Sequence, residues 1–141
     1  MSLVRSFLSC TLAFSPSPQD LTEYINCVDK SEKIEFVRSW SPIVSLYIPA
    51  PHIEKTLLVI YCESRGKADA TNINTNSEGL YKDSIDQGIL QWNSVTFDWL
   101  SSKLNIPNDP YNPIVSLKAL AWTLKHVGWS WWNSSKACWS Y

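Results

Sequence analysis

The chain has 141 residues, of which 45% are hydrophobic and 18% are charged, and its formal net charge is −1. That length supports one domain with a buried core and is short for two. A nucleic-acid-binding domain would show a basic stripe, which is absent here, so we expect no nucleic-acid partner. No apolar run reaches the roughly 20 residues of a membrane-spanning helix, so we expect no membrane span.

The N-terminal segment combines a short apolar stretch with a helix start. Residues 1–14 weakly resemble a secretion signal, although Ser, Cys and Thr interrupt the apolar part; the alternative is an arm that lies on the domain. Ser17 can cap a helix that begins at Pro18, and apolar residues at helical spacing predict about three turns up to Asp29. We therefore expect an N-terminal arm and helix over residues 1–30 and a main domain over residues 31–141.

A clearer helix is predicted over residues 52–65, whereas residues 31–49 are ambiguous between strand and helix. Gly66 is the expected stop of the clearer helix, and Glu63 lies in its last turn. The residues that mark its buried face are Ile53, Leu57, Ile60 and Ser64.

The second half of the chain predicts a polar segment followed by two helices. Residues 67–87 are rich in Asn, Thr, Ser and Asp, which indicates turns and short strands. Ser94 is the predicted cap of a short helix, and Asn112 with Pro113 begins the last long helix, which Gly128 ends. The expected buried side of that last helix contains Leu117, Leu120, Ala121, Leu124 and Val127.

Tryptophan usage indicates a sugar-binding wall. Eight tryptophans are more than a domain of this size needs for its core, and four of them follow Gly128. Trp129, Trp131 and Trp132 are therefore candidates for stacking on the apolar face of a sugar, although one or two of them are expected in the core.

The four cysteines, Cys10, Cys27, Cys62 and Cys138, allow three disulfide pairings. The chain has no Cys-x-x-Cys spacing of the kind that holds zinc, and we expect no metal and no cofactor. If a pair is bridged, the protein works in an oxidising compartment.

Two carboxyl groups lie in contrasting surroundings, as glycoside cleavage requires. Glycosidases pair a protonated acid with an ionised carboxylate, so the pKa values of the two groups must differ. Glu63 follows the apolar residues 57–61, where burial would raise its pKa, whereas Asp86 lies in a polar stretch. Taken singly, they are an ordinary helix-end glutamate and a turn aspartate; the hypothesis depends on their combination with neighbouring motifs.

Three segments resemble the active-site region of animal C-type lysozymes and follow in the same order. They are Glu63-Ser64, Ala70-Thr71-Asn72-Ile73-Asn74-Thr75, and Asp86-Gln87-Gly88-Ile89-Leu90-Gln91-Trp92-Asn93-Ser94. Residues 77–83 depart from that pattern and are expected to form an inserted hairpin of about six residues. Trp92 also departs, because an aliphatic residue is usual there.

The same region is similar to small phage-type and bacterial lysozyme-like transglycosylase domains. The shared motifs are Cys62-Glu63-Ser64, Gly88-Ile89-Leu90-Gln91, and Trp132-Asn133-Ser134-Ser135-Lys136-Ala137-Cys138-Trp139. In those domains a Cys before the catalytic Glu accompanies a Cys in the closing motif, so the resemblance implies a Cys62–Cys138 disulfide; two buried thiols are the alternative. The pairing of Cys10 and Cys27 stays open. The resemblance covers residues 51–141.

The resemblance implies an α+β, mostly helical, lysozyme-like fold with a small β-hairpin region beside the catalytic helix, in a catalytic domain over residues 31–141. It implies that Glu63 is the general acid and that Asp86 is the nucleophile or electrostatic partner. The residues that it implies for substrate binding are Ser64, Asn72, Asn74, Gln91 and Asn93, with Asn74 hydrogen-bonding near Asp86.

The leading hypothesis is a muramidase that hydrolyses the β-1,4 bond between N-acetylmuramic acid and N-acetylglucosamine. One alternative is a lytic transglycosylase, which needs only the acid and forms a 1,6-anhydro product. Another is a non-catalytic glycan-binding or virion structural domain. The expected partner is peptidoglycan, the expected state is a monomer, and the expected location is secreted, periplasmic or virion-associated. The near-neutral charge provides no overall attraction to an anionic cell wall.

Overall fold

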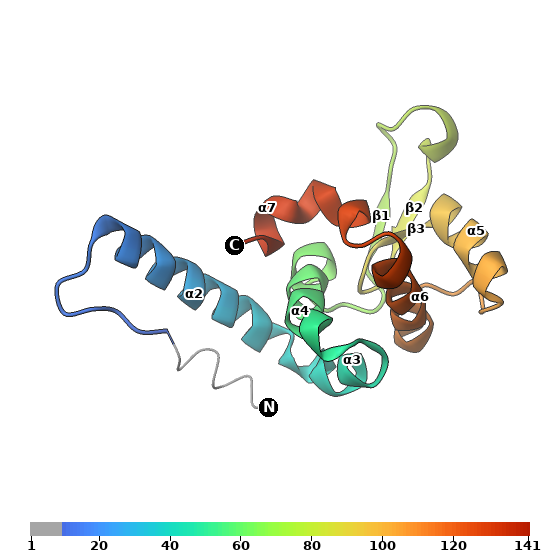
Figure 1. Cartoon of the computed structure of the whole chain (residues 1–141). Helices are drawn as coiled ribbons and strands as arrows, with labels where there is room; N and C mark the ends of the chain where they lie inside the picture. The colour runs from blue at the N-terminus through green and yellow to red at the C-terminus, as the bar shows by residue number, and fades with distance from the viewer. Residues whose placement is uncertain (1–9) are drawn as a thin grey trace.

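The computed structural model describes residues 10–141, so most of the signal-like segment lies outside the described residues. The α-helices are α2 (Pro18–Phe36), α3 (Ser41–Tyr47), α4 (Ala50–Ser64), α5 (Ser94–Leu104), α6 (Pro113–His126) and α7 (Lys136–Trp139). The strands are β1 (Thr71–Ile73), β2 (Ile85–Gln87) and β3 (Trp92–Asn93), and the 3₁₀ helices are η1 (Arg38–Trp40), η2 (Gly79–Tyr81) and η3 (Ser130–Ser135). Figure 1 shows helices grouped around α4 with the small sheet to one side, which confirms a mostly helical α+β fold. Between residues 10 and 141, no helix has both the length and the apolar character to cross a membrane.

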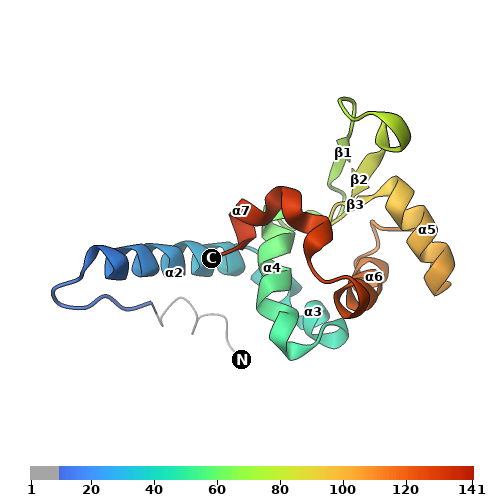
Figure 2. The ribbon, with the colours of Figure 1, turned by 45° about the horizontal axis from the view of Figure 1, so that its top comes forward.

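Helix α4 lies at the centre of the molecule, where α2, α3 and α7 contact it (Figures 1 and 2). Leu57, Leu58, Val59 and Ile60 are all buried, so the helix is covered on nearly every side rather than along one stripe. It ends at Ser64, one residue before the predicted end at Arg65, and Arg65 caps it with a φ of 54°. Gly66 then adopts a φ of 80°, and a Cβ added there would approach the Trp40 indole nitrogen to 3.0 Å.

Helix α2 begins as predicted but is longer. Ser17 caps it in a capping box with Asp20, and the helix continues past Asp29 to Phe36. In a strand Ile34 and Phe36 would share a face, but Ile34 is 1% exposed and Phe36 is 66% exposed. Packing on α4 selects the helix here, and the domain boundary expected after residue 30 falls inside it.

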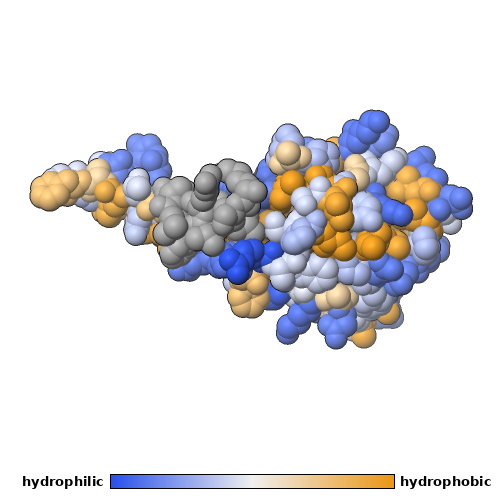
Figure 3. Space-filling view, turned by 90° about the horizontal axis from the view of Figure 1, so that it is seen from below, coloured by the Kyte–Doolittle hydropathy of each residue, from blue (hydrophilic) through white to orange (hydrophobic). Residues whose placement is uncertain are grey.

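The N-terminal half of α2 projects away from the rest of the fold. In Figures 1 and 3 it extends from the globular body, and a Cys10–Cys27 disulfide joins it to the preceding arm. A second disulfide, Cys62–Cys138, joins α4 to α7 inside the body.

The sheet is antiparallel with strand order β1-β2-β3. Its register places Asp86 opposite Asn72 on one side and opposite Asn93 on the other. Residues 77–83, the expected insertion, lie in the β1–β2 connection and include η2. Backbone hydrogen bonds between Asn74 and the residues Asp83 and Ser84 extend this hairpin beyond the strands.

The last two long helices follow their predicted starts closely. The Asn112 side chain caps α6 and Pro113 is its first residue, as predicted. For α5 the cap is Asn93 rather than Ser94, because the Asn93 side-chain oxygen accepts the Val95 N–H bond. Val127 lies beyond the end of α6 and is 39% exposed, so its predicted burial is wrong.

Candidate active site

Glu63 and Asp86 line one cleft of about 630 Å³, between the end of α4, the sheet and the C-terminal segment. Four other predicted site residues line it too: Gln91, Asn93, Trp131 and Trp132. The remaining lining residues are Leu80, Tyr81, Trp92, Val95, Thr96, Trp99 and Ser134. The two carboxyl groups, 23 residues apart in sequence, are therefore brought to a single cleft by the sheet register and the end of α4.

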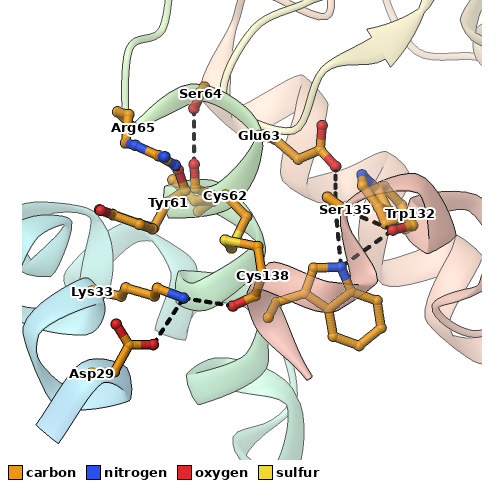
Figure 4. Close-up of a disulfide and its surroundings, with 12 residues drawn as sticks. Asp29, Lys33, Tyr61, Cys62, Glu63, Ser64, Arg65, Trp132, Ser135 and Cys138 are labelled. Atoms are coloured by element: carbon orange, nitrogen blue, oxygen red, sulfur yellow. Dashed lines mark hydrogen bonds and ion pairs between the residues drawn. A yellow bond between two sulfur atoms is a disulfide. The ribbon is translucent and has the colours of Figure 1, made fainter. Parts of the chain in front are cut away.

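The Glu63 carboxyl group accepts a hydrogen bond from the Ser135 hydroxyl. Ser135 Oγ donates to Glu63 Oε1 at 2.5 Å (Figure 4). It also accepts a bond from Trp139 Nε1 at 3.1 Å. Burial raises the pKa of Glu63, the negative charge of Asp86 raises it less, and the Ser135 hydrogen bond opposes both. A carboxyl group with a raised pKa retains its proton closer to neutral pH, as a general acid requires.

Asp86 has a different environment, made of side-chain amides. Its Oδ1 atom accepts hydrogen bonds from Asn74 Nδ2 and Asn93 Nδ2, each at 3.0 Å. The same two amides also donate to Ser84 Oγ, and the Asn93 oxygen caps α5. Because Asn93 is fixed by the helix start and Asn74 by the hairpin, the direction of the Asp86 carboxylate is fixed as well.

A sequence model of the transglycosylase SLT domain family matches residues 50–141, which is more than half of the chain. The chain belongs to the transglycosylase SLT domain family. No curated protein and no solved structure matches it. The family lies within the lysozyme-like superfamily, so the predicted resemblance and the lysozyme-like fold are both confirmed. The chain is thus a lysozyme-like enzyme of the kind that cleaves glycosidic bonds in peptidoglycan.

Four predicted binding residues of this SLT domain do not line the cleft: Ser64, Asn72, Asn74 and Trp129. Asn74 instead holds the Asp86 carboxylate. Ser64 is buried and donates to the carbonyl oxygen of Ile89 at 2.8 Å, so it joins α4 to the turn between β2 and β3. Asn72 donates to Gln91 Oε1 at 2.6 Å and thereby orients a lining residue. Trp129 packs against Trp132 and Trp139 behind the wall.

The two predicted tryptophans that line the cleft, Trp131 and Trp132, differ in burial. Trp131 is 40% exposed, which leaves ring surface open for a sugar. Trp132 is 4% exposed, and its Nε1 donates to the carbonyl oxygen of Leu90 at 2.9 Å. Trp132 therefore supports the turn that carries Gln91, while Trp131 is the more accessible of the pair.

The Cys62–Cys138 disulfide holds the Ser135 segment beside Glu63. Cys62 directly precedes Glu63, and Cys138 lies one turn after Ser135. Lys33 of α2 donates to the Cys138 carbonyl oxygen at 2.8 Å and pairs with Asp29 at 3.0 Å (Figure 4). Helix α2, which precedes the family match, thus contacts the segment that positions the acid.

Sequence reasoning missed Ser135, Tyr81 and Trp99. Ser135 lies within the closing motif, but its contact with Glu63 spans 72 residues and no local pattern reveals it. Tyr81 belongs to the insertion. Trp99 offered a usable signal, because it does not fall on the α5 face that Phe97 and Leu100 define, and it is 53% exposed.

Proposed function

We propose that this SLT domain is a lytic transglycosylase, in preference to the muramidase that the sequence motifs favoured. The family match over residues 50–141 carries this proposal, because SLT domains are typically lytic transglycosylases. The reaction needs a single group that first donates and then accepts a proton. Glu63, half-buried with a raised pKa, is suited to that role.

In the proposed reaction Glu63 donates its proton to the oxygen that links N-acetylmuramic acid C1 to N-acetylglucosamine O4. The C1–O4 bond breaks, and the muramic acid ring develops oxocarbenium character. The Glu63 carboxylate then removes the proton from the 6-hydroxyl of the same muramic acid as O6 bonds to C1. The product is a 1,6-anhydro end, no water is consumed, and Glu63 is protonated again.

Ser135 and Asp86 are proposed to stabilise opposite charges during this cycle, one on the Glu63 carboxylate and the other on the sugar. The Ser135 hydroxyl donates to Glu63 Oε1 and so stabilises the carboxylate present between the two proton transfers. Asp86 lines the same cleft, and its negative charge is placed to stabilise positive charge developing at C1.

Muramidase activity is the second candidate, and the position of Asp86 favours it. A hydrolase uses a second carboxylate as nucleophile or stabiliser, and the Asn74 and Asn93 amides fix Asp86 in this cleft. Water would then replace the 6-hydroxyl as the final acceptor of the sugar.

We further propose that the domain works outside the cytoplasm as a monomer. Two disulfides support an oxidising compartment, since structural disulfides persist mainly in such environments.

Mass spectrometry of the fragments released from purified peptidoglycan tests the proposal. Products with 1,6-anhydro-N-acetylmuramic acid ends, lighter by one water than hydrolysis products, are expected. Products with reducing N-acetylmuramic acid ends would contradict the proposal and indicate a muramidase instead. Glycan binding without any release, by a folded and oxidised sample, would contradict both and favour a non-catalytic binding domain.

A further inference from the structure

Trp99 is an exposed aromatic residue of the cleft that the proposed reaction does not use. It lies on α5, lines the cleft, and is 53% exposed. On the α6 side its ring meets the Trp122 ring edge to face, with centroids 6.3 Å apart and planes at 73°. A large apolar ring left open on a cleft wall is a candidate contact for a ligand.

Trp122 and His126 of α6 support the Trp99 ring. The imidazole of His126 is stacked on the Trp122 ring at 4.4 Å with an interplanar angle of 18°. One face of Trp122 is therefore covered, and its position is set by α6. Trp122 supports Trp99, and Trp99 is the ring available to a ligand.

A positive charge lies beside this aromatic pair. Lys103 is one turn after Trp99 on α5, and its Nζ atom lies 5.7 Å from the Trp99 ring centroid and 5.8 Å from that of Trp122. The cleft itself is lined by two carboxyl groups, and its described lining residues include no lysine or arginine. With a chain net charge of −1, attraction of an anionic ligand must come from such a local charge.

We propose that Trp99 is the stacking platform of an additional glycan subsite at the α5 end of the cleft. We also propose that Lys103 pairs there with a carboxylate of the peptide stem that a muramic acid residue carries. This inference rests on the proposed function and extends it to substrate choice: glycan strands that retain anionic peptide stems bind better than uncharged glycans. The sugar stacks on the open part of the Trp99 ring, and the flexible lysine stem carries its ammonium group to the stem peptide.

Binding measured by calorimetry on the Glu63→Gln background tests this subsite without turnover. The probes are N-acetylglucosamine oligomers and peptidoglycan glycan fragments of equal sugar number that carry their peptide stems. Trp99→Ala is expected to weaken binding of both by about 10-fold, the effect of removing one good aromatic contact. Trp99→Phe, which keeps a ring, is expected to retain part of the affinity and guards against misfolding of the alanine variant.

Lys103→Gln is expected to weaken only the peptide-bearing fragments, by about two- to fivefold, and the difference should disappear at high salt. Lys118→Gln, at an exposed lysine of α6, is the matched control and should change neither affinity. Unchanged binding by Trp99→Ala would overturn the platform, and an equal effect of Lys103→Gln on both probes would overturn the charge pairing. Failure of the proposed function is distinct, because the parent protein would then release no anhydro fragments whatever these variants do.

Discussion

Glu63 and Asp86 face one cleft from two regions that are built on different principles. The Glu63 region is apolar and cross-linked: a buried helix, a disulfide and a closing segment bring one hydroxyl to the carboxyl group. The Asp86 region is polar and half-buried, and a short sheet with two asparagine amides orients the carboxylate. One small domain thus gives its two carboxyl groups separate chemical behaviour, through burial around Glu63 and hydrogen-bond donors around Asp86.

Removing the Glu63 acid should have the largest effect on fragment release. We expect Glu63→Gln to reduce fragment release by about 100- to 10,000-fold, because general acid catalysis contributes that range. Affinity for glycan should persist, since the amide keeps the shape of the side chain. Fragment release and calorimetric binding measure the two quantities on the same sample.

Asp86→Asn is the matched variant for the second carboxyl group. A lytic transglycosylase should lose far less activity with this change than with Glu63→Gln. Equal losses from the two substitutions would instead indicate the two-carboxylate route of a muramidase.

Opening the Cys62–Cys138 disulfide should produce the next largest change. The bridge spans 76 residues of sequence, so we expect Cys62→Ser with Cys138→Ser to lower the free energy of unfolding by about 4 kcal/mol. Activity should fall as well, because Ser135 is then released from Glu63. Chemical denaturation and fragment release are the measurements.

The control for that experiment is the other bridge, Cys10–Cys27, on the projecting arm. Its replacement by serines should leave activity near the parent level. Loss of activity there would show that the arm contributes to the cleft.

The pH profile of activity should shift in opposite directions when Ser135 and Asp86 are substituted, because they act in opposite ways on the pKa of Glu63. Burial raises the pKa of Glu63, so the alkaline limb of activity should lie above the ordinary glutamate range. Ser135→Ala removes a hydrogen bond that lowers this pKa, and the limb should move to higher pH. Asp86→Asn removes a charge that raises it, and the limb should move to lower pH. Shifts in the same direction for both would contradict the assignment of Glu63 as the acid.

The smallest expected effect concerns stability. Because the folded-state pKa of Glu63 is raised, its contribution to stability is fully present below the unfolded value and is lost as pH rises through the folded value. Glu63→Gln should therefore raise the melting temperature at neutral pH relative to the parent and show no such gain in acid. Thermal unfolding at the two pH values checks the difference.

Local sequence features predicted much of the fold. The Ser17 and Asn112 caps, each followed by proline, were predicted correctly because caps depend on neighbouring residues alone. The extension of α2 to Phe36 was not, since alternation over a few residues is ambiguous until a packing partner selects one face. The predicted burial of Val127 was wrong for a similar reason, because α6 ends at His126, just before it.

What the sequence determined by itself is the pair of carboxyl groups in contrasting local settings, because the apolar run before Glu63 and the polar stretch around Asp86 are local properties. Only the tertiary structure decided which other side chains meet them. Ser135 reaches Glu63 across 72 residues, Trp129 packs behind the wall, and Trp99 lines the cleft. The physical reason is that a periodic pattern specifies which face of a helix is buried, whereas the packing of distant elements determines what that face touches.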